Sequence, residues 1–371
     1  MKLLIPGPVS TRPEVRAALT EDFAPWDLDF RPLAADVRSR LLAISGVGPD
    51  THDCLPIQGS GHFVIEAALR TFVPYDARVL VPMTGGYAVR LARLARECGR
   101  EVLELAMGER ERVDPHAVGA ALAADRTISH LAFVYSETSS GIVHDAEALV
   151  RVARREHRRV IIDAVSAFGA LPLDLSTMPE VDAALFTANK CLEGIPGLAF
   201  AISPSQRLAG RVGQAQSWCL DLADIHVHGE RNGVGSFRFT PPAQVLNALS
   251  VALDLFAAEG GCERRLARYR ANLKVLADGV RAIGLTPYLP QQLQGPIVFN
   301  VHAPDDPRWD LQSFVDRVKD RGFVISNFFD TEMPSFRVGL IGALGPDDFR
   351  EAVGAIDGAL RELGIQKREA A

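Results

Sequence analysis

The chain has 371 residues, of which 47% are hydrophobic and 23% are charged. These proportions are typical of a globular protein of about two domains and exclude a disordered, fibrous or coiled-coil chain. Lys and Arg number 40 against 46 Asp and Glu, so the formal net charge is −6. No basic cluster is present, and nucleic-acid binding is not expected because neutralising phosphates requires a concentrated Lys/Arg face.

The apolar runs and the cysteines indicate which classes of protein the chain does not belong to. No run approaches the roughly 18 uninterrupted apolar residues of a membrane-spanning helix, and the N-terminal apolar run is too short for a secretory signal. The five cysteines are odd in number, widely scattered and without a C-x-x-C pair. We therefore expect no disulfide framework and no zinc site, but reduced thiols in a cytoplasmic protein.

From about residue 53 to residue 203, short apolar runs rich in Val, Ile and Phe alternate with amphipathic segments. Strands separated by helices of this length need crossover connections, which predicts a mainly parallel sheet covered on both faces. We expect seven strands, at 54–57, 79–81, 102–105, 128–134, 160–163, 183–187 and 198–202. Helices are expected between them at 63–71, 87–98, 115–123 and 146–156.

After residue 204 the pattern changes to longer helices. Two of them are predicted at 244–259 and 262–283, broken at Gly260-Gly261. A smaller lobe follows, with strands expected at 297–301, 324–326 and 336–339 and helices at 310–320 and 346–362. The whole chain is therefore predicted to be α/β, with a large sheet domain and a small α+β domain.

Polar residues gather where the predicted parallel strands end, which is where ligands bind in such sheets. Gln58-Gly59-Ser60-Gly61-His62 follows the first strand and opens a helix, whose free N–H groups could hold a phosphate together with Ser60. A Ser-capped helix after a glycine turn explains the same segment. The segment is neither the dinucleotide-binding fingerprint nor a P-loop.

Asp163 and Lys190 each stand at the end of an apolar strand. An unpaired charge there is costly, so Asp163 needs a partner or else caps the following helix. Lys190 lies between a strand and a Gly-Pro loop, whereas most lysines lie on solvated faces. A partly desolvated amine is the kind that forms a Schiff base.

A phosphate cradle, a carboxylate and a lysine, each at a strand end, are the groups that pyridoxal 5′-phosphate (PLP) requires. The lysine holds the aldehyde, the carboxylate keeps the ring nitrogen protonated, and a helix N-terminus takes the phosphate. Tyr87, just after another predicted strand, is a candidate to cover the ring, or else a plain half-buried tyrosine. The order of these groups along the chain predicts PLP as the cofactor.

The residues also resemble a known family, the class V aminotransferases of the fold-type I PLP enzymes. The resemblance runs from residue 6 to about residue 342. Within the class, it is closest to the branch that moves an amino group from 2-aminoethylphosphonate to pyruvate. The matching motifs are Pro6-Gly7-Pro8, Trp26-Asp27, Gln58-Gly-Ser-Gly61, Ser136-Glu-Thr-Ser-Ser-Gly141, Asp163-Ala-Val-Ser-Ala-Phe-Gly169, Ala188-Asn-Lys-Cys191, Gly194-Ile-Pro-Gly197, Arg238-Phe-Thr240 and Phe336-Arg-Val-Gly339.

The resemblance implies a large PLP-binding domain with a mainly parallel seven-stranded sheet, a small α+β domain, and a homodimer with active sites shared between subunits. The implied divisions are an N-terminal arm of the small domain at 1–20 and the large domain at 21–245. Residues 246–371 are expected to form long linking helices and the small C-terminal domain.

Carried over residue by residue, the resemblance makes Lys190 the lysine that carries the cofactor and Asp163 the partner of the ring nitrogen. Thr138 is expected near the phenolic oxygen of the ring, and Tyr87 on the face of the ring. The residues that fall where relatives hold the cofactor phosphate are Ser60, Gly61 and His62, with Thr240 reaching it from the neighbouring subunit.

Arg337 matches the arginine that binds the substrate carboxylate, a task suited to a bidentate guanidinium. Trp26 is implied as a second substrate-binding residue. Two positions depart from the pattern of relatives. Phe237 stands where they have Tyr or Trp, and the loop at 326–330 lacks the lysine that the phosphonate enzymes carry.

The implied activity is a ping-pong transfer from 2-aminoethylphosphonate, or a related aminophosphonate, to pyruvate, giving phosphonoacetaldehyde and alanine. An alanine–glyoxylate or serine–pyruvate type reaction on a non-phosphonate donor is the alternative. A cysteine desulfurase would need a mobile cysteine late in the chain, and none follows Cys262. A hydrolase with Ser60 or Ser166 as nucleophile would need a G-x-S-x-G elbow, which the sequence lacks.

Overall fold

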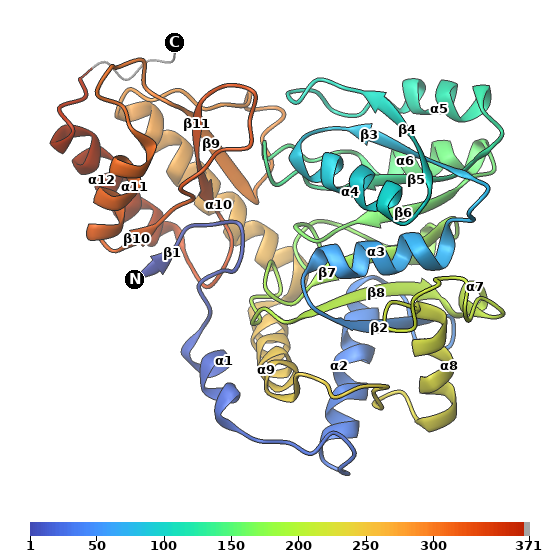
Figure 1. The fold of residues 1–371 in the computed structure, drawn as a ribbon. Coiled ribbons are helices and arrows are strands. Elements are labelled where there is room, and N and C mark those ends of the chain that lie inside the picture. The colour runs from blue at the N-terminus through green and yellow to red at the C-terminus, as the bar shows by residue number, and fades with distance from the viewer. Residues whose placement is uncertain (367–371) are drawn as a thin grey trace.

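A seven-stranded sheet forms the centre of the computed structural model, which describes residues 1–366 (Figure 1). The strand order is β2-β8-β7-β6-β5-β3-β4. Within this sheet only β8 runs against its neighbours, because it follows β7 through a loop and not through a helical crossover. The strands are β2 (His52–Gln58), β3 (Arg78–Met83), β4 (Glu101–Ala106), β5 (Ile128–Val134), β6 (Arg159–Asp163), β7 (Val181–Thr187) and β8 (Leu198–Pro204). The prediction of a mainly parallel sheet is confirmed.

Helices cover both faces of the sheet. Side chains alternate along each strand, so Leu131 and Phe133 of β5 face one apolar cluster while Ala132 and Val134 face the other. The first cluster is completed by α2 (Phe30–Ile44), α5 (Pro115–Ala124), α6 (Ala146–Arg155) and α9 (Ala243–Glu259). The second is completed by α3 (Gly61–Phe72), α4 (Gly86–Glu97) and α8 (Leu222–Asn232).

Helix α9 and the following helix α10 (Gly261–Ala282) meet at an angle of 80°. Gly260 has φ +105° and Gly261 has φ +68°, in the left-handed region that favours glycine. The break predicted at these two glycines is therefore confirmed. Within residues 1–366 no single helix meets the length and hydropathy needed to cross a membrane, and this bent pair meets them only when its two helices are taken together.

The smaller lobe contains both ends of the described chain (Figure 1). β9 (Val298–His302) pairs antiparallel with β11 (Ser335–Gly339), and β1 (Lys2–Leu3) pairs parallel with β10 (Phe323–Val324). Phe299, Phe314, Phe336 and Phe349 are buried together between these strands and the helices. The helices of this lobe are α10, α11 (Leu311–Asp320) and α12 (Pro346–Glu362).

Several helices lie outside the predicted elements. In α8, two histidines and Gly229 obscure the helical pattern, yet the Asp221 carboxylate caps it by accepting the Asp224 N–H at 3.0 Å. In α2, the buried apolar residues are interspersed with three arginines and one aspartate, and Arg38 is itself buried, which hides the apolar spacing. The others are the short α1 (Pro13–Ala17), α7 (Ser205–Leu208) and the 3₁₀ turns η1 (Ala18–Thr20) and η2 (Leu175–Thr177).

Candidate active site

The carboxyl ends of β6 and β7 and the starts of α3 and α4 enclose a cavity of about 120 Å³. This is the edge of the sheet at which ligands bind in α/β proteins. Six residues singled out in the sequence lie together around the cavity. Its lining is Ser60, Gly61, His62, Ile65, Tyr87, Arg90, Asp163, Val165, Thr187, Asn189 and Lys190.

Lys190 is the only buried lysine in the described part of the chain, with 8% of the residue exposed. Burial, together with the nearby charge of Arg337, lowers its pKa to about 8. At such a pKa a useful fraction of the amine is neutral near neutral pH, and the neutral amine is the nucleophile. The lysine is thus prepared to attack a carbonyl group.

The N-terminal segment covers Lys190. A Cβ atom added to Gly7 would lie 2.7 Å from Cδ and 3.0 Å from Nζ of the lysine, and Gly7 has φ +140°. A Cβ on Gly339 of β11 would lie 2.4 Å from the carbonyl carbon of Ile5. The chain at residues 5–7 therefore passes tightly between β11 and the lysine. The motif at 6–8 is visible in the sequence, but its contact with Lys190 joins residues far apart and has no local signal.

Asp163 is the last residue of β6 and is 4% exposed. Burial, with a smaller contribution from the nearby Glu137, raises its pKa to about 7, against the lowering effect of a 2.9 Å hydrogen bond from the Val165 N–H. A carboxyl group with this pKa can hold a proton near neutral pH. It is therefore suited to share a proton with a basic ring nitrogen placed in the cavity.

The start of α3 offers several groups to an anion. Ser60 occupies the N-cap position, and its hydroxyl makes no capping hydrogen bond to the helix. The N–H groups of the first turn and the helix dipole favour negative charge there. A Cβ on Gly61 would lie 2.9 Å from a methyl group of Val165, so only glycine fits at this close approach. Burial lowers the pKa of His62, and the charges of Arg90 and Lys190 lower it further.

One buried hydroxyl in the cavity has no partner. Thr187, at the end of β7, has a buried Oγ1 atom that makes no hydrogen bond to the described residues. Buried polar atoms are nearly always paired, and leaving one unpaired costs about 1–3 kcal/mol. The hydroxyl is accounted for if a polar ligand occupies the cavity.

Helix α4 also begins at the cavity, and a buried carboxylate fixes it. Glu137 is fully buried and accepts the N–H groups of Tyr87 at 3.2 Å and of Ala88 at 3.4 Å. Burial raises the pKa of the Tyr87 phenol. Arg90 follows on the same helix, with its guanidinium 4.6 Å from the centroid of the Tyr87 ring. Glu137 is a site residue without a sequence signal beyond its place in the motif at 136–141.

Arg337 comes from β11 of the smaller lobe and reaches the large lobe. It is 2% exposed, and its Nη1 donates to the Thr138 carbonyl at 2.9 Å while Nε lies 3.3 Å from the Ser326 hydroxyl. Burial lowers the pKa of the Arg337 guanidinium. Thr138 is itself buried, and its hydroxyl bonds to Ser166. Arg337 thus holds a fixed positive charge near Lys190.

A buried ionic network joins the loop after Lys190 to the loop after β11. Arg268 of α10 donates to the Glu193 carboxylate at 2.7 Å and to the Leu344 carbonyl at 2.8 Å. The Tyr269 hydroxyl donates to the same Glu193 oxygen at 2.8 Å. The network fixes the loop that carries Lys190 against the strand that carries Arg337. No local pattern in the sequence indicates it, because its members come from three distant segments.

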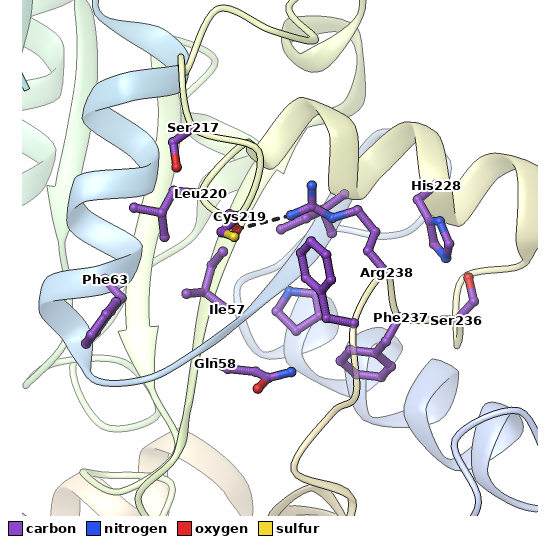
Figure 2. A pocket seen from close by; sticks show the side chains of 13 residues that line it. Ile57, Gln58, Phe63, Ser217, Cys219, Leu220, His228, Ser236, Phe237 and Arg238 are labelled. Atoms are coloured by element: carbon purple, nitrogen blue, oxygen red, sulfur yellow. Dashed lines mark hydrogen bonds between the residues drawn. The ribbon is translucent and has the colours of Figure 1, made fainter.

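Four residues implied by the resemblance are not among those that line the cavity: Thr138, Arg337, Trp26 and Thr240. The last two are exposed in the single chain. Trp26 is 76% exposed. Thr240 is also exposed, and its carbonyl accepts a hydrogen bond from Gln58. Beside Gln58 lies a separate, largely apolar pocket of about 430 Å³, in which Arg238 reaches the carbonyl of Cys219 (Figure 2).

Comparisons with known protein sequences place the chain in a family. The family model for aminotransferase class-V matches residues 49–317. A 2-aminoethylphosphonate–pyruvate transaminase of Burkholderia ambifaria (strain MC40-6) is 44% identical over 363 residues, covering 98% of this chain and 96% of that protein. A protein of the same name from Pseudomonas putida (strain W619) is 42% identical over 363 residues, covering 98% of each chain.

Solved structures show the same fold. A pyridoxamine–pyruvate aminotransferase from Mesorhizobium loti superposes with a TM-score of 0.88 at 25% identity, covering 99% of this chain and 94% of that chain. A ureidoglycine–glyoxylate aminotransferase from Bacillus subtilis has a TM-score of 0.88 at 24% identity, covering 98% and 94%. At that identity the second likeness concerns the fold alone.

Proposed function

Because the chain belongs to the class V aminotransferases, we propose that it transfers the amino group of 2-aminoethylphosphonate, or of a closely related aminophosphonate, to pyruvate. The products are phosphonoacetaldehyde and alanine. The relatives at 42–44% identity that carry this activity in their names support the substrates. The observation that supports the chemistry is the buried Lys190, with a pKa near 8, lining one cavity with the buried Asp163.

The residues of the cavity fit PLP. The unpaired hydroxyl of Thr187 and the uncapped first turn of α3 are polar groups that such a ligand satisfies. Ser60, Gly61 and His62 would hold the phosphate, and Asp163 would keep a proton on the ring nitrogen. Tyr87 would cover the ring, and Thr138 would lie near the phenolic oxygen. When bound, the cofactor supplies an electron sink for charge on the carbon next to the amine.

Lys190 has two tasks in this proposal. Its Nζ atom would hold the cofactor before the donor amine arrives. The Nζ atom would then take the proton of the carbon next to the substrate nitrogen and later return it, acting as general base and then as general acid. A pKa near 8 suits both tasks because the group can accept and return a proton near neutral pH.

Arg337 orients the carboxylate of pyruvate and alanine. Its Nη1 and Nε are held by Thr138 and Ser326, so the guanidinium is positioned before the substrate arrives. Gly7 and the segment around it cover Lys190 and limit the entry of water.

The proposed assembly is a homodimer with shared active sites, in the cytoplasm. Trp26 and Thr240 line no part of the cavity in one chain, and a second subunit would bring such residues to it. The apolar pocket beside Gln58 is bordered by exposed Phe63 and Phe239, which supports burial of this surface against a second copy. All five cysteines are unpaired, which fits a reducing compartment.

A donor screen tests the substrate. The PLP-loaded enzyme is given pyruvate with 2-aminoethylphosphonate, serine, glycine or glutamate, and alanine formation is measured. The proposal expects 2-aminoethylphosphonate to have the highest kcat/KM. A preference for serine or another amino acid would favour the alternative of a serine–pyruvate or alanine–glyoxylate type enzyme. The loop at 326–330 carries the acidic Asp330 and no lysine. This difference from the phosphonate enzymes is the reason to test the alternative.

A further inference from the structure

Among the described residues, one guanidinium group lines the cavity that holds Lys190, and it belongs to Arg90. Arg90 lies one turn after Tyr87 on α4, stacked on the tyrosine ring. Burial lowers the pKa of His62, and the charge of Arg90 lowers it further. Arg90 is therefore close enough to act on an anion that is bound beside the lysine.

The contacts of Arg90 leave its charge available. Its side chain is 41% exposed, and its ion pair with Asp330 is long, at 3.5 Å from Nη2 to Oδ2. An exposed pair of this kind is weak. Arg337 differs, because it is 2% exposed and its Nη1 and Nε are both engaged by the protein. An incoming anion can displace Asp330 from Arg90 at little cost.

The substrates of the proposed reaction carry their anionic groups at different places. In alanine the carboxylate is attached to the carbon that bears the amine, whereas in 2-aminoethylphosphonate the phosphonate is on the next carbon. With the nitrogen in the same place, the phosphonate lies about one bond, or ~1.5 Å, further out. It also carries close to two negative charges, as phosphate esters do. One guanidinium fixed by two hydrogen bonds does not suit both positions.

We propose that Arg90 binds the phosphonate of the amino donor while Arg337 binds the carboxylate of pyruvate and alanine, a division that rests on the proposed function. Two N–H groups of Arg90 donate to two phosphonate oxygens, the bidentate geometry that arginine favours. The phosphonate takes the place of the Asp330 carboxylate. Arg90 thereby sets the preference for the donor without affecting the acceptor.

The test follows the two half-reactions separately. PLP-loaded Arg90→Gln is mixed with 2-aminoethylphosphonate or with alanine, and the single-turnover change in cofactor absorbance is recorded. Apparent affinity for 2-aminoethylphosphonate should fall roughly 10- to 150-fold, the range for one charged hydrogen-bonded pair. Affinity for alanine should be unchanged. Arg93→Gln is the matched control, because Arg93 lies on the same helix with its side chain 76% exposed.

A second readout avoids the chemistry. Ethylphosphonate lacks the amine, so calorimetry with the loaded enzyme measures its binding alone. Its Kd should rise in Arg90→Gln and stay the same in Arg93→Gln. If Arg90→Gln does not fold, Arg90→Lys is used in its place, because lysine keeps the positive charge but lacks the bidentate geometry of the guanidinium. We then expect a smaller loss of affinity, and only for the phosphonates.

The outcomes separate this inference from the proposed function. If Arg90→Gln lost affinity equally for 2-aminoethylphosphonate and alanine, or lost affinity for neither, the proposed role of Arg90 would be overturned. Loss of phosphonate binding only in Arg337→Ala would overturn it as well. A wild-type enzyme that reacts with alanine but not with 2-aminoethylphosphonate contradicts the proposed function itself, whichever variant is used.

Discussion

Asp163 and Asp182 are buried carboxylates on the neighbouring strands β6 and β7, but at opposite ends of the sheet. Burial alone raises the pKa of Asp182, yet hydrogen bonds from His130 and Arg207 hold it below its usual range. The His130 contact measures 3.2 Å and the shorter Arg207 contact 2.8 Å. Asp163 has instead the Val165 N–H, and its pKa rises to about 7.

The difference separates a structural carboxylate from a functional one. At the amino ends of the parallel strands, Asp182 is surrounded by cations and its charge is satisfied by the protein. At the carboxyl ends, Asp163 and Lys190 line a cavity with strongly shifted pKa values and few partners. Groups left unsatisfied at one end of a sheet indicate a ligand there. The predictions below separate the two ends, from the largest expected effect to the smallest.

Lys190→Ala should reduce turnover by more than about 10⁴-fold, because it removes both the attachment point and the proton carrier. The fold should persist, since the lysine forms no part of the apolar clusters. Steady-state alanine formation measures the loss. Lys274→Ala, on the exposed face of α10, is the control and should be fully active. Substantial multiple-turnover activity in Lys190→Ala without added amine would contradict the assignment.

Asp163→Asn should lower kcat by roughly 10²- to 10⁴-fold, the usual contribution of a positioned acid or base. PLP should still bind, because the phosphate and lysine contacts remain. The free energy of unfolding should not fall. A carboxyl pKa raised to about 7 means that ionised Asp163 destabilises the folded state as the pH rises from about 4 through 7, and the amide removes this cost. Near-native kcat would make Asp163 a helix cap only.

Asp182→Asn should have the opposite profile. Loss of the carboxylate leaves Arg207 and Arg159 without their buried partner, which should lower the free energy of unfolding by about 3–5 kcal/mol. The kcat of the folded fraction should be unchanged. Because the folded-state pKa of Asp182 is depressed, its stabilisation is present above pH ~4 and is lost in more acidic solution. Urea unfolding of the wild type and of Asp182→Asn at pH 7.5 and at low pH measures the difference in their free energies of unfolding. A difference that does not decrease at low pH would contradict the prediction.

Arg337→Ala should weaken saturation by pyruvate by roughly 10- to 150-fold, or about 1.5–3 kcal/mol, as expected for one charged hydrogen-bonded pair. Arg337→Lys should restore only part of the binding, since the fork is lost. The KM for pyruvate gives the measurement. Unchanged pyruvate binding in Arg337→Ala would mean that another arginine holds the carboxylate, and Arg90 is the candidate because it lines the cavity.

The pH dependence of cofactor capture gives the smallest effect. Since the neutral amine attacks, the rate at which the apo-enzyme binds PLP covalently should rise as the pH increases and level off above about 8, the pKa of Lys190. An ordinary solvated lysine would continue to gain rate up to its usual pKa near 10.4. Stopped-flow absorbance distinguishes the two profiles.

The features that can be predicted from the sequence are those that depend on residues close together in the chain. The sheet follows from apolar runs separated by amphipathic helices, and Asp163 and Lys190 are recognised because each ends such a run. The contact between Gly7 and Lys190 and the link from Arg268 to Glu193 are different. They join segments separated by many residues, and only the folding of the smaller lobe onto the sheet brings them together. Trp26 and Thr240 line no part of the cavity in the single chain, so their roles remain proposals.

Borohydride trapping tests most directly the claim that the unsatisfied end of the sheet holds the cofactor. The PLP-loaded enzyme is reduced, digested and mapped by mass spectrometry, and the chain offers only five lysines as acceptors: Lys2, Lys190, Lys274, Lys319 and Lys367. The expected result is a stoichiometric pyridoxyl group on the peptide that contains Lys190, with none in Lys190→Ala. A pyridoxyl group on any other lysine, or an equal yield in Lys190→Ala, would contradict the claim.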